Sequence, residues 1–441
     1  MGNQPRIIFV NRYFYPDHSA TSQMLSDLAF ALADEGRSIT IVSSRERYDD
    51  PSARLPTKES IKGVEIVRVW TSRFGRSNLL GRSSDYLSFY FSAATSLLWR
   101  IKRGDIVVAK TDPPMLSLLS APLCWVKGAK AVNWLQDLFP EVAEASELGR
   151  GRVARTLFAI LKKFRNASLS GSHQNIAIGR RMALRLRASG LWPERITTLS
   201  NWADGRLITP VASSSNPLRA AWSLEDAFVV AYSGNLGRAH EIDTMLQAMK
   251  CLQEQQHSDE NTAKPQIVWL FIGAGAQMES LQKAVTTGGF TNVRFQPYQP
   301  RETHSQSLSV GDVHLVSLRP ELEGLIVPSK YYGIAAAGRP AIFIGDQQGE
   351  EATLLKDYQA GIAVACGDAD GLARAILTYR DDEALRLKAG ANARMAFEHH
   401  HDLPAVVQSW QQLLDALTME EQEHARVAPT TASAPISVRE L

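Results

Sequence analysis

A short segment near residue 330 has the residue types that bind phosphate. Pro328 and Ser329 stand where a helix is expected to begin, with Ser329 as its N-cap, and Lys330 follows in the first turn. Gly338 can end this helix, and the apolar run AIFIG after Pro340 is typical of a buried strand. Unpaired backbone N–H groups and an ammonium favour an anion, so the segment predicts a phosphate site, although an ordinary helix–turn–strand unit has the same pattern.

Two glycine-rich turns follow strand-like runs in the same half of the chain. The run FVVAYS leads into GNLGR, where Gly234 and Gly237 let the backbone approach a ligand and Arg238 can hold a diphosphate. The run FIGAGAQ begins like a dinucleotide fingerprint at Gly273, but Met278 takes the place of its third glycine. Because open α/β sheets bind ligands at the carboxyl ends of their strands, these turns predict one shared site with Lys330.

A carboxylate in the first half of the chain is the candidate catalytic group. Asp137 directly follows the apolar run AVNWLQ, at the predicted carboxyl end of a strand. There it can position or stabilise a reacting group, or it can simply cap the turn that begins at Leu138. An Asp-x-Asp pair occurs at 368–370, but Gly371 and a predicted helix follow it, which favours a capping role.

The elements that position these residues alternate between strands and helices. The predicted strands are 6–10, 38–44, 64–70, 105–110, 129–137, 196–202, 228–234, 266–273, 292–298, 313–318 and 341–345. Helical patterns between them indicate an α/β fold with parallel sheets in two Rossmann-like domains, 1–203 and 204–402, separated in a segment rich in Ala, Ser and Pro. A helix is predicted over 403–419, and the composition of 420–441 is typical of a disordered tail.

Composition sets the class of protein and its compartment. The 441 residues exceed one core of usual size, and the three cysteines lie far apart, which favours a reducing compartment. Residues 1–205 contain 29 basic and 18 acidic side chains, whereas residues 206–441 contain 19 and 28. The first half is therefore basic and favours an anionic surface or substrate, in a soluble, cytoplasmic protein.

One basic stretch is a candidate membrane contact. Residues 149–186 contain nine Lys and Arg residues and no acidic one, and VARTLFAILKKF alternates cations with large apolar side chains. Such a helix can lie on an anionic membrane surface or pack on the first domain with a solvated edge. The membrane-facing candidates are Arg152, Arg155, Lys162 and Lys163. No nucleic-acid-binding signature accompanies these cations.

An ordered set of motifs resembles a known family. The motifs are YFYPDHSATSQMLSDLAFAL, QDLFPE, LSNW, YSGNLGRAHEID, FIGAGAQ and VPSKYYGIAAAGRPAI, within residues 6–415. Together they resemble a bacterial family 4 glycosyltransferase of the subgroup with colanic-acid and O-antigen sugar transferases. The resemblance implies a GT-B fold, in which two Rossmann-like domains face a cleft and the last helix crosses back to the first domain. It also implies retention of anomeric configuration and no metal.

The resemblance assigns roles to the candidate residues. Asp137 would be catalytic, and the donor diphosphate would meet the second domain and the turn at 19–21 of the first. The donor-binding residues would be Ser19, Ala20, Thr21, Gly234, Asn235, Gly237, Arg238, Gly273, Ser329 and Lys330.

Two positions depart from the family pattern. Gly333 stands where many relatives have a Glu that binds the donor ribose, and His240 and Glu241 stand where a Lys is expected. Lys330 can supply the missing cation, and we expect Glu350 or Glu351 to reach the ribose hydroxyls.

The resemblance therefore implies a reaction and its partners. A sugar would pass from a UDP- or GDP-sugar, which is a substrate rather than a cofactor, to a membrane-associated acceptor that is a polyprenyl-diphosphate-linked saccharide. The enzyme would act at the inner face of the cytoplasmic membrane in exopolysaccharide or O-antigen synthesis. A sugar-nucleotide epimerase of related fold and a non-catalytic partner subunit remain as alternatives.

Overall fold

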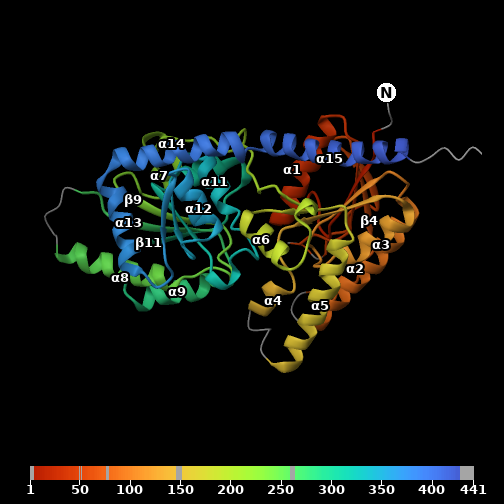
Figure 1. The fold of residues 1–441 in the computed structure, drawn as a ribbon. Coiled ribbons are helices and arrows are strands. Elements are labelled where there is room, and N and C mark those ends of the chain that lie inside the picture. The colour runs from red at the N-terminus through yellow and green to blue at the C-terminus, as the bar shows by residue number, and fades with distance from the viewer. Residues whose placement is uncertain are drawn as a thin grey trace, which may run out of the picture.

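The computed structural model describes residues 4–48, 50, 52–75, 79–145, 151–258 and 264–427. They form two α/β bodies side by side, and two consecutive helices, the second of them long, run along one side, one over each body (Figure 1). The described helices include none with the length and apolar composition needed to cross a membrane.

The first domain is built on an eight-stranded sheet with the order β3-β4-β2-β1-β5-β6-β7-β8. Its strands are β1 (Ile7–Val10), β2 (Ile39–Ser44), β3 (Lys58–Ile61), β4 (Val64–Val69), β5 (Ile106–Ala109), β6 (Lys130–Leu135), β7 (Gln174–Ala177) and β8 (Ile196–Thr198). Only β3 pairs antiparallel, with β4, among these strands. Runs such as IIFV are buried at every position because helices cover both faces of the parallel part.

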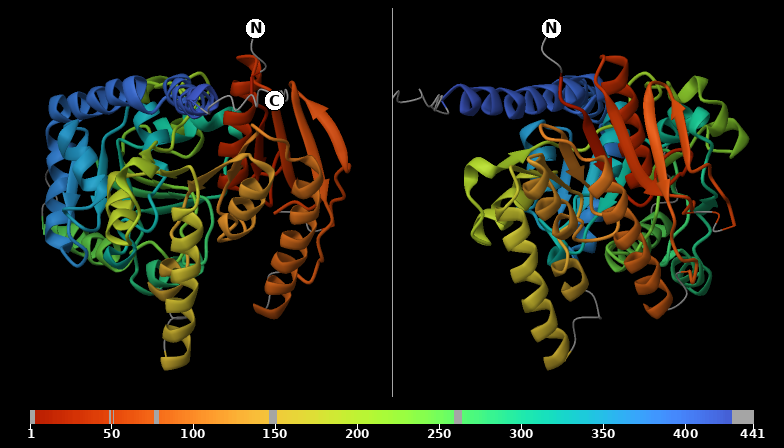
Figure 2. Two further views of the ribbon diagram at one scale, coloured as in Figure 1. Left: turned by 45° about the vertical axis from the view of Figure 1, so that its right-hand side comes forward. Right: turned by 90° about the vertical axis from the view of Figure 1, so that its right-hand side faces the viewer.

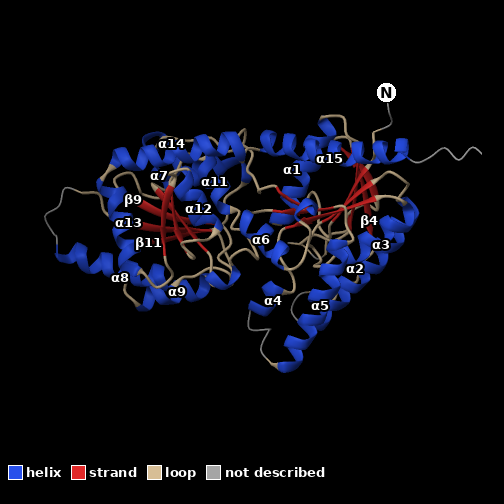
Figure 3. Ribbon diagram, viewed as in Figure 1, coloured by secondary structure: helices blue, strands red, loops and turns tan. Residues whose placement is uncertain are grey.

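The helices of the first domain lie around its sheet (Figure 3), and they separate its strands in the sequence except between β2, β3 and β4. They are α1 (Ala20–Asp34), α2 (Leu79–Arg100), α3 (Ser117–Lys127), α4 (Glu141–Ala145), α5 (Arg152–Ser170) and α6 (Arg180–Ala188). Helices α2 and α5 extend beyond the sheet on the side away from the long helix (Figure 2).

The second domain has a six-stranded parallel sheet with the order β11-β10-β9-β12-β13-β14. Its strands are β9 (Phe228–Ser233), β10 (Ile267–Ile272), β11 (Val293–Gln296), β12 (Val313–Ser317), β13 (Ala341–Ile344) and β14 (Gly361–Val364). Its helices are α7 (Pro217–Ala221), α8 (Asp243–Ser258), α9 (Met278–Thr287), α10 (His304–Ser309), α11 (Lys330–Ala336), α12 (Glu350–Asp357), α13 (Ala369–Asp381) and α14 (Glu383–His400).

Each sheet has one point where the strand order reverses. In the first domain the chain builds outward from β1 in one direction and from β5 in the other, and in the second domain it does so from β9 and β12. The loops after these strands diverge at such a point and leave a crevice for a ligand. The topology therefore selects the loops after β1, β5, β9 and β12 for the site.

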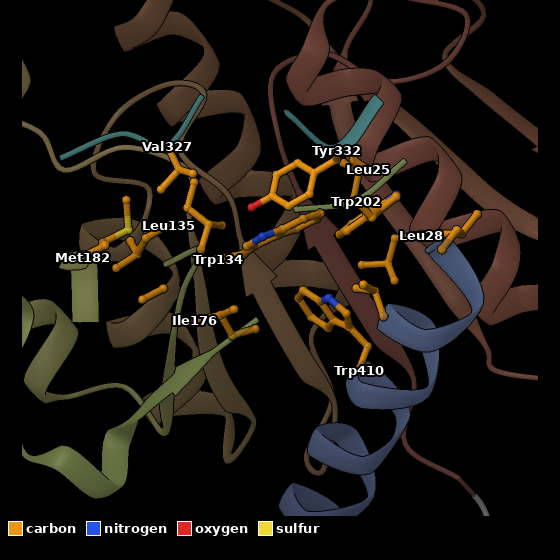
Figure 4. Packing of buried hydrophobic residues seen from close by; sticks show 14 of the residues in the cluster. Leu25, Leu28, Trp134, Leu135, Ile176, Met182, Trp202, Val327, Tyr332 and Trp410 are labelled. Carbon is orange, nitrogen blue, oxygen red and sulfur yellow. The ribbon is translucent and has the colours of Figure 1, made fainter. Parts of the chain in front are cut away.

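The long helix α15 (Leu403–Val427) crosses from the second domain back to the first. Its Trp410 packs edge-on against Trp134 of β6, with ring centroids 5.0 Å apart, and Trp134 stacks on Trp202 at 5.6 Å (Figure 4). Tyr332 of α11 belongs to the same buried cluster, so one apolar core spans both domains.

The predicted two-domain α/β fold and its crossover helix are confirmed, with four local corrections. The helix continues to Val427, so the prediction of a disordered tail from residue 420 is wrong for 420–427, and the rest of the tail lies outside the described residues. The sequence reading missed three short strands: β3 and β7, which carry polar residues, and β14, which has only four residues.

Candidate functional site

Lys330 begins α11 at the reversal point of the second domain. Its Nζ lies 2.9 Å from Nε2 of His240, whose Nδ1 lies 2.6 Å from the carbonyl oxygen of Ser317 at the end of β12. A carbonyl oxygen can only accept, so the imidazole hydrogen is on Nδ1 and Nε2 accepts from the Lys330 ammonium. Burial, assisted by the Lys330 charge, lowers the pKa of His240 to about 4, so the ring stays neutral.

The Lys330 ammonium is a half-buried positive charge available to an anion. Burial lowers its pKa to about 8, and it lies 5.2 Å from the ring centroid of Tyr232. In the described part of the chain it forms no ion pair with a carboxylate. Ser329 occupies the N-cap position as predicted, but its side chain makes no capping hydrogen bond, and α11 has only seven residues. The positive charge at this helix start therefore comes from Lys330 itself.

The two glycine-rich turns form one supporting layer beneath Lys330. Gly234 has φ +118°, and a Cβ there would lie 3.0 Å from Cε of Lys330. Gly273 has φ +126°, and its Cβ would lie 2.4 Å from the Gly234 carbonyl oxygen. The N–H of Gly234 also donates to Ile272 O at 2.8 Å. Glycine is required at both positions because the backbone of the Gly273 turn packs directly against the backbone of the Gly234 turn.

The tip of the first turn is open to solvent. Asn235 and Arg238 are exposed, and Arg238 forms no ion pair among the residues that the structure describes. Gly237 accepts through its carbonyl oxygen from the side chain of Gln277 at 2.6 Å, which fixes the turn. Lys330 and Arg238 thus provide two cations, one half-buried and one exposed, around the carboxyl end of β9.

Lys110, which sequence reasoning missed, occupies the reversal point of the first domain. It directly follows β5, is 2% exposed and donates from Nζ to the carbonyl oxygen of Thr21 at 2.6 Å. The ammonium lies 4.0 Å from the ring centroid of Trp134. Burial lowers its pKa to about 7, against the opposing charge of Asp112. The sequence signal for this residue was its place directly after the apolar run DIVVA, at the predicted end of a strand.

The predicted turn of the first domain lies beside Lys110. Helix α1 begins at Ala20, with Ser19 at its N-cap position. The carboxylate of Asp17 accepts from the backbone N–H of Ser19 at 2.8 Å and from its hydroxyl at 2.5 Å. Ser19, Ala20 and Thr21 are therefore held in place by Asp17 on one side and by Lys110 on the other.

Asp137 lies where the two domains meet. Its backbone bridges to Ile326 of the second domain, and the N–H of Leu138 donates to Leu325 O at 2.9 Å. Its side chain lines a small cavity of about 20 Å³ together with Lys110. Burial raises the pKa of Asp137 to about 6, although a hydrogen bond from Thr111 lowers it, and Oδ1 is buried without a partner among the described residues. The structure thus brings the candidate catalytic carboxylate to the domain junction.

Glu350 has a role that the sequence did not indicate. Its carboxylate accepts from the backbone N–H groups of Arg180 and Arg181 at 2.9 and 2.7 Å, and so caps helix α6 of the other domain. Glu351 is 1% exposed, and neither of its side-chain oxygens has a partner in the described chain. Burial, with the neighbouring Glu350 and Glu323, raises its pKa well above the usual range. That either residue binds the ribose stays a prediction.

The basic helix α5 exposes an apolar stripe. Val153, Leu157, Ile160 and Phe164 are 84%, 53%, 47% and 59% exposed, at a spacing that places them on one face. Arg152, Arg155 and Lys163 are exposed on the same helix. Lys162 differs, because its ammonium pairs with Glu144 of α4 within the first domain.

Comparisons with known proteins indicate the class of enzyme. The family model "Glycosyl transferases group 1" matches residues 215–396, which lie in the second domain. The probable glycosyltransferase WbjE of Pseudomonas aeruginosa is 24% identical over 372 residues, 84% of this chain and 88% of that protein. The putative colanic acid biosynthesis glycosyl transferase WcaI of Escherichia coli is 26% identical over 295 residues, 65% of this chain and 67% of that protein.

Solved structures support the same fold. Sucrose-phosphate synthase from Thermosynechococcus elongatus has a TM-score of 0.73 at 18% identity, covering 95% of this chain and all of that one. HepE from Anabaena, in complex with UDP-glucose, has a TM-score of 0.67 at 15% identity, covering 93% and 99%. The second domain is therefore a glycosyltransferase group 1 domain, and the chain is a glycosyltransferase with the GT-B fold.

Proposed function

We propose that this enzyme transfers a sugar from a UDP- or GDP-sugar to a membrane-associated, polyprenyl-diphosphate-linked saccharide in bacterial polysaccharide synthesis. The names of the relatives support the pathway, since they include colanic acid biosynthesis and lipopolysaccharide core biosynthesis. The observation that carries the proposal is the Lys330–His240 contact at the reversal point of the second domain, opposite Asp137 of the first.

The donor diphosphate lies, in this proposal, between Lys330 and Arg238 above the Gly234 turn. Two cations neutralise the charge that develops on the leaving nucleoside diphosphate when the sugar–phosphate bond breaks. Lys330 is held by His240 before the substrate arrives, which lowers the cost of reorganisation. With these two charges in place, the reaction proceeds without a metal ion and without a cofactor.

Asp137 acts, in this proposal, at the junction of the two domains, where the sugar is transferred. Its carboxylate is ionised at neutral pH, since its pKa is raised only to about 6. From the domain junction it orients the reacting group by hydrogen bonding, while Lys110 fixes the neighbouring turn at Thr21. The transferred sugar keeps its anomeric configuration, as the family resemblance implies.

The acceptor reaches the first domain from a membrane surface. The apolar stripe of α5 and its three exposed cations match an anionic bilayer, whose interface takes apolar side chains and attracts Lys and Arg. Helix α2 adds Leu80, Leu87 and Phe91, which are 83%, 68% and 75% exposed, and it extends to the same side as α5 (Figure 2).

Donor binding and transfer test the proposal separately. A thermal-shift screen of UDP, GDP and their sugars should raise the unfolding midpoint with one nucleotide class, because a ligand of the native state stabilises it. Transfer of labelled sugar from that donor to a polyprenyl-diphosphate saccharide should then continue in the presence of EDTA. A protein that binds no nucleotide sugar, or that transfers only after a metal is added, contradicts the proposal.

A further inference from the structure

The first domain has a second cavity, besides the small one beside Asp137. Both lie at the carboxyl edge of the sheet, but this one is nearer the β3 end of the strand order. It has a volume of about 600 Å³ and lies at the carboxyl ends of β2 and β4, which Arg45 and Trp70 directly follow. We call it the arginine groove, and it is lined by Arg45, Arg54, Trp70, Thr71, Ser72, Arg73 and Phe74.

Positive charge and a free hydroxyl make the groove a site for an anion. Arg54 is exposed and has no ion pair within the described ranges, and Arg45 is held by a hydrogen bond to Leu55 O at 3.1 Å. Arg73 lies 3.5 Å from Glu46, whose charge is already shared with Arg12 at 3.1 Å. Thr71 is 3% exposed, and its hydroxyl has no partner in the described part of the chain. An oxyanion would satisfy these donors.

The groove also offers flat apolar surface. Trp70 and Phe74 are 64% and 67% exposed, although large aromatic side chains ordinarily lose most of their accessible surface in a folded protein. Aromatic faces pack well against the apolar faces of ligands, while the guanidinium groups bind phosphate oxygens in two-point geometry. The combination fits a ligand that joins a phosphate group to an apolar chain or a sugar ring.

Asp85 of α2 holds one wall of the groove in shape. Its carboxylate, in a residue 2% exposed, accepts from the Ser72 hydroxyl at 2.8 Å and from the N–H groups of Phe74 and Gly75 at 3.0 and 3.1 Å. It also lies 3.6 Å from Arg12. The wall that carries Phe74 and Arg73 is thus fixed before any ligand binds, which reduces the ordering cost of binding.

The groove is separate from the reacting centre but connected to it. Neighbouring strands lie about 4.8 Å apart, so three to four strand spacings from β2 and β4 to β6 place the groove roughly 15–20 Å from Asp137. Arg12 lies between the groove and the reacting centre. Its guanidinium pairs with Glu46, and its backbone N–H donates to Asp112 O at 2.6 Å. A ligand in the groove is therefore too far from Asp137 to react there itself.

We propose that the arginine groove binds the diphosphate of the lipid-linked acceptor, with the start of its apolar chain on Trp70 and Phe74. This rests on the proposed function, because the acceptor class comes from it. Helix α2 begins a few residues after Phe74 and exposes Leu80, Leu87 and Phe91 along one face. The lipid chain leaves the groove along this face toward the membrane, and the saccharide points to Asp137.

Direct binding to the full chain tests the groove without requiring transfer. Farnesyl diphosphate and inorganic pyrophosphate serve as probes by titration calorimetry, with UDP as the donor-site ligand. Arg54→Glu should weaken farnesyl diphosphate at least tenfold and leave UDP affinity within twofold, whereas Arg374→Glu, an exposed arginine on α13, should change neither. Trp70→Ala should weaken farnesyl diphosphate but not pyrophosphate.

Several results would overturn the groove assignment. The assignment is wrong if the wild type binds neither probe. It is also wrong if Arg54→Glu binds farnesyl diphosphate as tightly as the wild type does. Displacement of farnesyl diphosphate by UDP would place that probe in the donor site instead. Equal affinity of the two probes with no effect of Trp70→Ala would indicate a site for free phosphate. Failure of the wild type to bind any nucleotide or nucleotide sugar would refute the proposed function alone.

Discussion

The Lys330 ammonium and the His240 ring are 2.9 Å apart, although they are 90 residues apart in the chain. Because the His240 Nδ1–H is committed to Ser317 O, the ring can only accept from Lys330. A neutral histidine thus aims a lysine at the crevice between β9 and β12. The sequence reading noted that a lysine was missing after Arg238; the structure shows that His240, at that place, positions Lys330.

Replacing Lys330 should weaken donor binding. We expect Lys330→Met to raise the Kd for the nucleoside diphosphate at least tenfold, because a partly buried charge-assisted contact of about 1.5–3 kcal/mol is lost. Lys250→Met on α8 is the control, since Lys250 is a surface lysine whose nearest carboxylate is 4.0 Å away. Equal nucleotide affinity of Lys330→Met and wild type by calorimetry would show that Lys330 does not contact the diphosphate.

The pH dependence of donor affinity should report the same group. The pKa of Lys330 is lowered to about 8, so the ammonium is present below pH 8 and is lost above it. Affinity should therefore be flat from pH 6.5 to 7.5 and fall by about tenfold per pH unit above pH 8. The Lys330→Met variant should lack this fall. A wild-type affinity that is unchanged up to pH 9.5 would contradict the assignment.

The sequence predicts the architecture well because its signals are local. Apolar runs such as FVVAYS mark buried parallel strands, and the Gly234 turn and the start of α11 lie where the pattern indicates. Pairings across long sequence separations carry no such signal. The approach of Lys110 to Thr21, the cap that Glu350 gives to α6, and the Lys330–His240 contact arise only when the sheets assemble. The site residues were thus predicted in part, and their partners were not.

Asp137 should determine how the transfer rate depends on pH on the acidic side of neutrality. Its pKa is raised to about 6, so the carboxylate forms as the pH rises through 6 and the rate should increase there. Asp137→Asn should lower kcat by about 10²–10⁴ and remove this pH dependence, while the Kd of UDP or GDP stays unchanged. Asp226→Asn, at an exposed position of the second domain, is the control. A full-rate Asp137→Asn enzyme would exclude a catalytic role.

The contact between the two glycine turns should be intolerant of a side chain. Gly273→Ala combines φ +126° with a Cβ 2.4 Å from the Gly234 carbonyl oxygen, so we expect a loss of about 2 kcal/mol or more and weaker nucleotide binding. Gly151→Ala is a matched control, because Gly151 has φ +114° and nothing within 4 Å of a Cβ. Urea unfolding of both variants separates backbone strain from collision; equal losses would show that the turns do not touch.

The paired substitutions Glu350→Gln and Glu351→Gln should give different results. Glu350→Gln replaces a charged cap of α6 by a neutral one and should loosen the domain junction, because a carboxylate binds a helix N-terminus more strongly than an amide. Glu351→Gln should change stability little, because neither buried oxygen of Glu351 has a partner among the described residues and burial raises its pKa, which favours the neutral carboxyl. Donor affinity measured on both decides the ribose hypothesis: if neither variant binds the donor more weakly, the hypothesis is wrong.

Membrane association should depend on the exposed face of α5. Arg152→Glu/Arg155→Glu should abolish most co-sedimentation with vesicles of phosphatidylglycerol and phosphatidylcholine at low salt, because each cation contributes about 1 kcal/mol near an anionic surface. Ile160→Asp, at a 47% exposed apolar position, should also weaken binding, and its loss should persist at high salt because it removes apolar contact. Arg374→Glu, an exposed arginine of the second domain, should bind vesicles as the wild type does. Lys162→Glu should behave differently, because Lys162 pairs with Glu144 within the first domain. This variant should lower the free energy of unfolding and leave vesicle binding nearly unchanged. If Arg152→Glu/Arg155→Glu and Ile160→Asp both sediment with vesicles as the wild type does, α5 is an exposed helix of the first domain and the acceptor reaches the enzyme by another route.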